Sequence, residues 1–161
     1  MNHKRIAVFP VEEFKAYKGT EGEMLVEGTV MTEDLDRQGE RMRIAGLRNL
    51  DEYRANPIVR WQHRDPIGHA VDIKVSKTKI HVVDSLAPAA LVLSEVWPLI
   101  EHGSIKAMSI GFYGHDGEDV KGTWEWKDWS WLEHSFVDIP ANPKAADAQM
   151  TASHAAAKRT M

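Results

Sequence analysis

Short segments in which apolar and polar residues alternate run along most of the chain, with Gly, Pro, Asp or Asn between them. A two-residue period places successive side chains on opposite faces of a β-strand. It therefore predicts strands over residues 5–9, 23–32, 58–63, 67–75, 79–85, 105–113, 123–126 and 131–139. Many short strands joined by polar turns predict a mainly β fold with a few helices (α+β), built as a small closed or partly open β-barrel flanked by those helices.

Two segments break this period and are predicted to be helical. Residues 47–55 form a short amphipathic stretch that ends before Asn56-Pro57, because the residue before a proline avoids helical geometry. Residues 89–102 form the second helix, and Gly103 suits the left-handed position at its end. Pro98 is unfavourable inside a helix, so we expect regular helix to begin at Ser94, which could cap it. The polar residues 115–122 are expected to form a solvated hairpin tip.

Residues 106–112 place small side chains around a serine hydroxyl. In a strand, Ala107, Ser109 and Gly111 share one face, while the larger apolar side chains between them point the other way. Small neighbours leave the Ser109 hydroxyl uncovered, so that a substrate backbone could approach it as an added strand, as nucleophilic catalysis requires. A serine that fills a small gap on a half-buried strand is the alternative interpretation.

Two further residues could assist such a hydroxyl. His63 ends a strand pattern in which Val59 and Trp61 share its apolar face, so we expect it to be half buried at the end of that strand. Glu133 lies in a segment that is apolar on both faces, and strict alternation places it on the face of Trp131. An unpaired carboxylate there costs on the order of several kcal/mol, so Glu133 should have a partner or be protonated, and an imidazole is a suitable partner.

Ser109, His63 and Glu133 together supply a nucleophile, a base and a carboxylate that orients the base, which are the groups that acyl transfer requires. The pattern does not show that these three segments meet, since a chain with eight histidines offers many such combinations. Arg60 and Arg64 could assist an oxyanion or be ordinary surface charges, and backbone N–H groups are the expected donors.

A zinc peptidase is the competing enzyme hypothesis. His63, His69 and His81 are loosely grouped, but the sequence has no His-Glu-x-x-His motif. We therefore expect neither a metal nor a cofactor.

Composition narrows the class of protein without identifying it. The chain has 161 residues, of which 43% are apolar and 27% charged, as in an ordinary globular domain. We expect one domain over residues 1–145 and a loosely ordered, alanine-rich tail over 146–161. There is no cysteine, which excludes disulfides and thiol catalysis.

Charge and hydropathy indicate whether nucleic acid or a membrane is an expected partner. A net charge of −4 gives no support to a nucleic-acid partner, which clustered Lys and Arg would indicate. The tryptophans at 124, 126, 129 and 131 lack basic neighbours, so they are expected in the core rather than in a base-stacking platform. No apolar stretch approaches the ~20 residues that span a bilayer, so no membrane partner is expected.

Four blocks, in the expected order, resemble the caudovirus prohead serine protease family, which is thought to share its fold with the herpesvirus assemblins. The first runs from Gly-Thr-Val at 28–30 to the acidic turn Asp-Arg-Gln-Gly-Glu at 36–40. The second is Pro-Ile-Val-Arg-Trp-Gln-His at 57–63, followed by Pro-Ile-Gly at 66–68. The third runs from 95 to 100 and then from Gly103 to Phe112, including Ser-Ile-Gly-Phe. The fourth extends from Leu132 through Pro-Ala-Asn-Pro at 140–143.

The resemblance implies a fold, an activity and roles for three residues. It implies a herpesvirus-protease-like barrel with Ser109 as the nucleophile, His63 as the catalytic histidine and Glu133 as the third member. The implied activity is that of a serine endopeptidase inside the assembling prohead in the host cytoplasm. Its implied substrates are the scaffold protein, or the scaffolding segment of the major capsid protein, and the protease itself, with the alanine-rich tail as a hypothetical self-cleavage region. The assemblin likeness also implies a possible homodimer.

The residue after the glutamate departs from the family pattern. His134 stands where the family commonly has a small aliphatic residue, and the herpesvirus relatives use a histidine as third member. Neighbouring strand residues face opposite ways, so Glu133 and His134 cannot both contact His63 without a bulge. We favour Glu133, because its less polar surroundings leave it in greater need of a partner. Because of His134, a catalytically inactive capsid-assembly factor with the same fold stays open, as does a generic β-barrel binding module.

Overall fold

The computed structural model describes residues 4–8 and 12–138, whose strands join in one nine-stranded sheet. The strands are β1 (Lys4–Val8), β2 (Glu12–Lys18), β3 (Met24–Thr32), β4 (Glu40–Met42), β5 (Ile58–Trp61), β6 (Asp65–Val75), β7 (Lys79–Leu86), β8 (Ala107–Val120) and β9 (Thr123–Val137). Their order is β1-β8-β9-β5-β6-β7-β3-β2, and β4 pairs with β9. Among the strands of the described residues, only β4 and β5 run parallel to a neighbour, in both cases β9.

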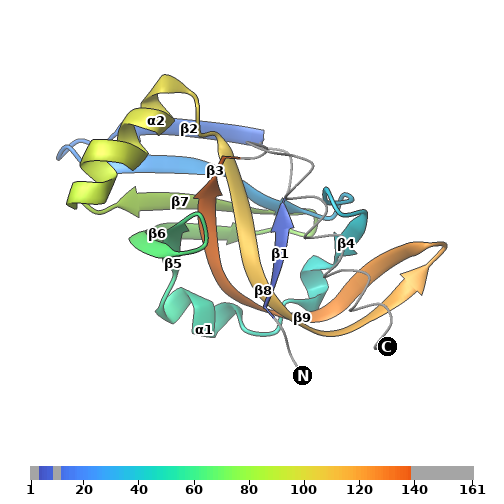
Figure 1. Cartoon of the computed structure of the whole chain (residues 1–161). Helices are drawn as coiled ribbons and strands as arrows, with labels where there is room; N and C mark the ends of the chain where they lie inside the picture. Colours follow the sequence, from blue (N-terminus) through green and yellow to red (C-terminus); the bar gives the residue numbers. More distant parts are fainter. Residues whose placement is uncertain (1–3, 9–11, 139–161) are drawn as a thin grey trace.

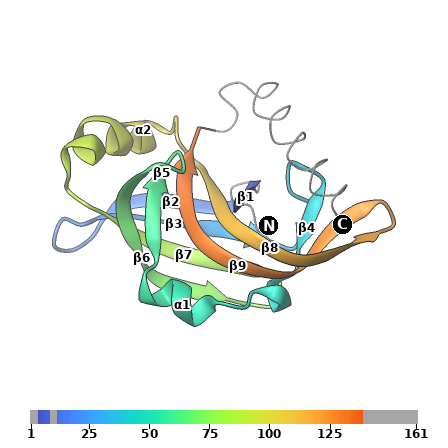
Figure 2. The same cartoon turned by 60° about the horizontal axis from the view of Figure 1, so that its bottom comes forward.

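The sheet curls into a half barrel that is open between its two end strands, β1 and β2 (Figures 1 and 2). This confirms the prediction of a mainly β, partly open barrel with a few helices. The sequence pattern did not predict β2 or β4. The hairpin tip predicted over residues 115–122 is present and solvated, but it is shorter than predicted, because β8 continues to Val120 and the turn comprises Lys121 and Gly122. Their φ angles of 53° and 86° suit a tight hairpin. Polar side chains along β8 hid its extension beyond residue 114.

Helical segments lie at two places in the described chain. A 3₁₀ turn (Ile44–Gly46) precedes α1 (Leu50–Ala55), and a π-helical segment (Val92–Val96) leads directly into α2 (Trp97–His102). The π-helical segment lies just before Pro98, which has no N–H to donate to the preceding helical turn. Gly103 ends α2 with a φ of 85°, as predicted. Ser94 does not cap a helix, because its hydroxyl donates to the Ala90 carbonyl at 2.7 Å.

The core fills the concave side of the sheet. Fully buried side chains from distant strands meet there, including Val26, Met31, Val59, Ile80 and Phe136. The tryptophans at 124, 126, 129 and 131 are 0–7% exposed, which confirms that they are core residues.

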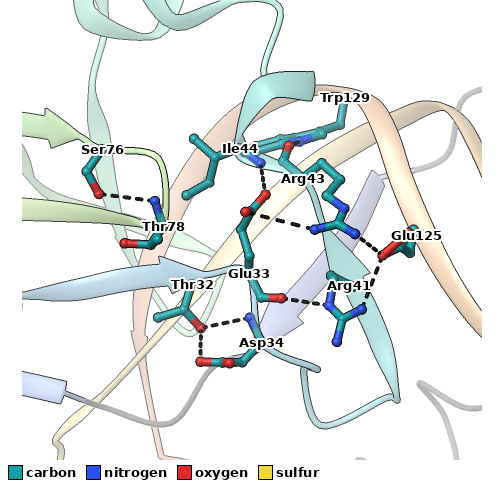
Figure 3. Close-up of polar contacts among 10 residues, drawn as sticks. All are labelled: Thr32, Glu33, Asp34, Arg41, Arg43, Ile44, Ser76, Thr78, Glu125 and Trp129. Carbon is teal, nitrogen blue, oxygen red and sulfur yellow. Dashed lines mark hydrogen bonds and ion pairs between the residues drawn. The ribbon is translucent and has the colours of Figure 1, made fainter.

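A polar network joins the β8–β9 hairpin to β3 and β4 (Figure 3). The guanidinium groups of Arg41 and Arg43 bind the buried Glu125 carboxylate at 3.2 and 2.6 Å. Glu33 accepts the Ile44 N–H at 2.9 Å, which fixes the 3₁₀ turn. The predicted tail over 146–161 lies outside the described residues. No helix in the described part of the chain is long and apolar enough to cross a membrane.

Candidate active site

Ser109 lies on β8, which is paired on both sides. Its partner on β9 is Ser135, and Gly111 lies opposite Glu133. A Cβ atom on Gly111 would lie 2.6 Å from Glu133 Oε1 and 2.5 Å from Lys4 Cε. Gly111 therefore provides the space in which the Glu133 carboxylate lies.

His63 is not part of the strand in which the alternation placed it. Strand β5 ends at Trp61, and both Gln62 and His63 adopt left-handed backbone conformations, with φ of 53° and 60°. Few residues other than glycine adopt this conformation. The turn carries the imidazole away from the face of Val59 and Trp61, so the prediction of a shared face is wrong.

A bulge in the β8–β9 pairing decides where Glu133 points. Gly111 pairs with Glu133, but the next residue, Phe112, pairs with Trp131, which leaves Leu132 as an extra residue on β9. Since Gly111 and Phe112 face opposite ways, Glu133 and Trp131 do too. The prediction that they share a face is therefore wrong, because strict alternation does not allow for a bulge.

The three side chains form a connected chain of polar contacts. Ser109 Oγ lies 2.9 Å from His63 Nε2, and His63 Nδ1 lies 2.5 Å from Glu133 Oε1. A serine hydroxyl can donate to Nε2 only if that nitrogen carries no hydrogen, and Nδ1–H then donates to the carboxylate. The structure thus brings together the three residues that the sequence proposed.

The Glu133 carboxylate is buried but has several partners. Lys4 Nζ lies 2.9 Å from Oε1, and the Ser135 hydroxyl donates to Oε2 at 3.0 Å. Burial raises the pKa of Glu133, but the hydrogen bond and charge of His63, together with those of Lys4, outweigh it and lower the pKa to about 2. Glu133 is therefore an anion at neutral pH, as an orienting carboxylate must be.

Strand β1 covers the nucleophile candidate. Val8 pairs with Ser109, and the Ser109 hydroxyl lies 3.3 Å from the Ala7 carbonyl oxygen. Ser109 is 0% exposed, whereas the His63 side chain keeps 15% of its surface in contact with solvent. The strand edge predicted to receive a substrate is thus occupied by the chain itself (Figure 1).

His134 belongs to a different cluster on the opposite face of β9. Its Nδ1 lies 2.7 Å from the Tyr53 hydroxyl, and its Nε2 lies 2.8 Å from both oxygens of Asp84. Burial and the charges of Asp84 and Glu133 raise the pKa of Tyr53. Glu133, and not His134, is the residue that contacts His63.

Two residues of the site, Ser135 and Lys4, were not predicted from the sequence. Ser135 follows Glu133 by two positions, so alternation could have placed it on the same face. Lys4 gave no such signal, because its contact depends on the pairing of β1 with β8.

The two arginines considered for the oxyanion lie in different surroundings, and the histidines considered for zinc do not form a metal site in the described residues. Arg60 pairs with Ser135 across β5 and β9, and its Nε is buried without a hydrogen-bond partner among the described residues. Arg64 is exposed. Within residues 4–8 and 12–138, no group of three or more His, Asp or Glu side chains could hold a metal ion.

Comparison with solved structures identifies the class of fold. The chain is similar to the capsid assembly protease of bacteriophage T4, with a TM-score of 0.69 and 10% sequence identity. The match covers 86% of this chain and 99% of that protein. At this identity the likeness shows the fold alone, which is that of a phage capsid assembly protease.

Sequence comparison finds two similar phage proteins. No family model matches the chain. It is 29% identical over 133 residues to the prohead protease of Escherichia phage T5, covering 76% of this chain and 60% of that protein. It is 38% identical over 95 residues to the capsid polyprotein of Pseudomonas phage PAJU2, covering 53% of this chain and 14% of that protein. The chain is thus similar to phage head proteins, among them a prohead protease, and it spans less than two thirds of the length of either relative.

Proposed function

We propose that the chain is a serine endopeptidase of phage head maturation. The observation that carries this proposal is the connected series from Ser109 Oγ to His63 Nε2 at 2.9 Å and from His63 Nδ1 to Glu133 Oε1 at 2.5 Å. These distances lie within or near the hydrogen-bond range that proton transfer requires.

Each residue has a distinct chemical role in the proposed mechanism. His63 Nε2 takes the hydroxyl proton as Ser109 Oγ bonds to the carbonyl carbon of a peptide. Glu133 accepts Nδ1–H, which fixes the tautomer and stabilises the imidazolium that forms. His63 then gives the proton to the leaving amine, and water hydrolyses the acyl-enzyme by the same route. Backbone N–H groups are the proposed oxyanion donors. Arg60, which pairs with Ser135 across β5 and β9, is the cation proposed to assist them.

The proposed substrates follow from the relatives. One is a prohead protease and the other a capsid polyprotein. We infer that this chain cleaves the scaffold protein, or the scaffolding segment of the major capsid protein, and itself. The proposed place of action is the assembling prohead in the host cytoplasm.

Access to Ser109 depends on β1. A peptide that pairs with β8 beside Ser109 uses the backbone groups that β1 now uses, because an edge strand offers one free row of N–H and C=O groups. Substrate binding in this mode therefore requires β1 to leave, and the Lys4 contact with Glu133 is lost with it.

A catalytically inactive capsid-assembly factor is the second candidate. The full burial of Ser109 beneath β1 favours it, because a covered hydroxyl cannot attack a substrate. In that case the His63 and Glu133 contacts would only stabilise the fold.

Coexpression with the capsid and scaffold genes separates the two candidates. Wild-type chain is expected to produce shortened capsid or scaffold bands on a denaturing gel, and Ser109→Ala is expected to abolish them. Ser130→Ala is the control, because Ser130 lies on β9 and its hydroxyl contacts His115 rather than the site. Identical band patterns for wild type and Ser109→Ala would favour the assembly factor.

A further inference from the structure

The backbone that carries His63 is held in an unfavourable conformation. Gln62 and His63 both have positive φ angles, and the turn closes through the Arg64 N–H, which donates to the Trp61 carbonyl at 3.0 Å. Non-glycine residues keep such conformations only where surrounding contacts impose them. The contacts that impose this one decide where the imidazole points.

Both N–H groups at the top of the turn donate to β9. The Gln62 N–H donates to the Phe136 carbonyl at 3.0 Å, and the His63 N–H donates to the Ser135 hydroxyl oxygen at 3.1 Å. The first partner is a backbone carbonyl, which any residue would supply. The second is a side chain, so the contact at His63 depends on the identity of residue 135.

The directions of the hydrogen bonds at Ser135 are fixed. A backbone N–H can only donate and the Glu133 carboxylate can only accept, so the Ser135 hydroxyl accepts from His63 and donates to Glu133 Oε2 at 3.0 Å. The other carboxylate oxygen, Oε1, receives His63 Nδ1–H. Backbone N–H, hydroxyl, carboxylate and imidazole thus form a closed ring of hydrogen bonds that begins and ends at His63.

We propose that Ser135 is a positioning residue for the peptidase site, a role that rests on the proposed function. Its hydroxyl fixes the left-handed backbone of His63 and the second oxygen of Glu133 together, which keeps Nε2 directed at Ser109. Ser135 is fully buried, so no water replaces its hydroxyl. When β1 leaves and Lys4 goes with it, Ser135 stays as a donor to Glu133.

A serine that merely fills space predicts a different outcome from a serine that positions His63. Ser135→Ala removes one oxygen and creates little extra volume, whereas Ser135→Thr keeps the hydroxyl and adds a methyl group. A space-filling role therefore favours Ala over Thr. A positioning role favours Thr over Ala.

The test measures the reactivity of Ser109 towards a fluorophosphonate probe. In this reaction Ser109 Oγ bonds to phosphorus, fluoride leaves, and the hydroxyl proton passes to His63 Nε2. Full-length wild type, Ser135→Ala, Ser135→Thr and the control Ser130→Ala are labelled over hours, and the adduct is quantified by intact mass. Thermal unfolding of each variant is measured in parallel.

We expect Ser135→Ala to label about 10-fold to 100-fold more slowly, as a small misplacement of a catalytic group does, while Ser135→Thr and Ser130→Ala stay within about threefold of wild type. With a peptide substrate the loss should appear in kcat and leave KM unchanged. Equal labelling of Ser135→Ala and wild type, or faster labelling of Ala than Thr, would overturn the role of Ser135. Wild type that takes no label at Ser109 would instead overturn the proposed function on which it rests.

A second variant tests the backbone contact even if Ser135→Thr fails to fold. Glycine adopts positive φ without a steric penalty, so Gln62→Gly makes the turn less dependent on Ser135. We expect Gln62→Gly to restore labelling of Ser135→Ala by about threefold or more, a coupling typical of residues in one network. Purely additive effects of the two substitutions would contradict the backbone part of the proposal.

Discussion

Strand β9 carries two clusters of the same chemical type on its opposite faces. On one face, His63 lies between Glu133 and the Ser109 hydroxyl, and on the other, His134 lies between Asp84 and the Tyr53 hydroxyl. Each cluster joins a histidine, a carboxylate and a hydroxyl at hydrogen-bond distances. Only the first has the features that a nucleophilic site needs.

The two clusters differ in the hydroxyl and in access. Tyr53 is stacked on Trp131 with ring centroids 3.8 Å apart, and the His134 and Asp84 side chains are both 0% exposed. The Ser109 hydroxyl lies beside β1, an end strand of the sheet, and against His63, which retains some exposure. The presence of a hydroxyl, a histidine and a carboxylate in contact is therefore insufficient to identify a nucleophilic site. The hydroxyl must also lie where a peptide can displace the segment that covers it. The Tyr53 cluster instead connects α1, β7 and β9, and we assign it to stability.

The largest expected difference between the two clusters is in how much a substitution in each lowers the rate of peptide cleavage. Ser109→Ala should lower peptide cleavage by at least about 1,000-fold, because the nucleophile is removed. Tyr53→Phe should leave cleavage per folded molecule within about threefold, although it leaves His134 Nδ1 without its phenol partner and costs about 1–3 kcal/mol of stability. Cleavage assays with the folded fraction measured in parallel check this. Comparable losses in both variants would contradict the distinction.

Stability should show the opposite pattern. Asp84→Asn leaves a buried histidine without its carboxylate partner and should lower the free energy of unfolding by about 3–5 kcal/mol. The control is Asp72→Asn, because the Asp72 side chain is 48% exposed and should change stability by less than about 0.5 kcal/mol. Denaturant titration measures both. A small effect of Asp84→Asn would remove the structural role assigned to this cluster.

The Glu133 pKa predicts how stability depends on pH. The folded-state pKa is lowered from 4.5 to about 2, so the carboxylate stabilises the fold above pH 4.5 and loses this contribution as the pH falls towards 2. The free energy of unfolding of wild type, relative to Glu133→Gln, should therefore fall by about 3 kcal/mol between pH 5 and pH 2. Urea titrations at a series of pH values measure the difference. A difference that does not change with pH would mean that the carboxylate has no such partners.

The cover over Ser109 should be removable, unlike the packing around Tyr53. Ala7 is 0% exposed, so Ala7→Asp places a carboxylate in the core unless β1 leaves. We expect labelling of Ser109 by a fluorophosphonate to become about tenfold faster or more, since the accessible state becomes more populated. Lys15→Asp on the opposite end strand, where Lys15 is exposed, is the control. An unchanged labelling rate would show that β1 does not limit access.

The candidate residues could be identified from the sequence, but the directions in which their side chains point could not. Alternation identified Ser109 with its small neighbours, and the need of a buried carboxylate for a partner pointed to Glu133. Alternation placed His63 and Glu133 on the wrong faces. A left-handed turn at His63 and a bulge before Glu133 each change the face of a side chain, and neither can be recognised from the residue types. The opposite faces of neighbouring residues meant that only one of Glu133 and His134 could contact His63, and the pairing of β8 and β9 maintains this at that point. The choice of Glu133 rested on less polar surroundings, which assumed a face shared with Trp131.

Long-range pairing explains what the sequence could not predict. Lys4 and Ala7 contact the site only because β1 pairs with β8, about a hundred residues later in the chain. The extension of β8 beyond residue 114 was hidden because its side chains there are mostly polar, and the strand forms by pairing with the backbone of β9. The long, continuous β9 also replaces two shorter predicted strands.

The most direct test of the central claim is the mass of the intact protein after treatment with a fluorophosphonate. If Ser109, His63 and Glu133 act as a nucleophilic site, wild type gains one adduct, which peptide mapping locates at Ser109, and Ser109→Ala gains none under the same conditions. An adduct at another residue, or equal labelling of wild type and Ser109→Ala, would contradict the account.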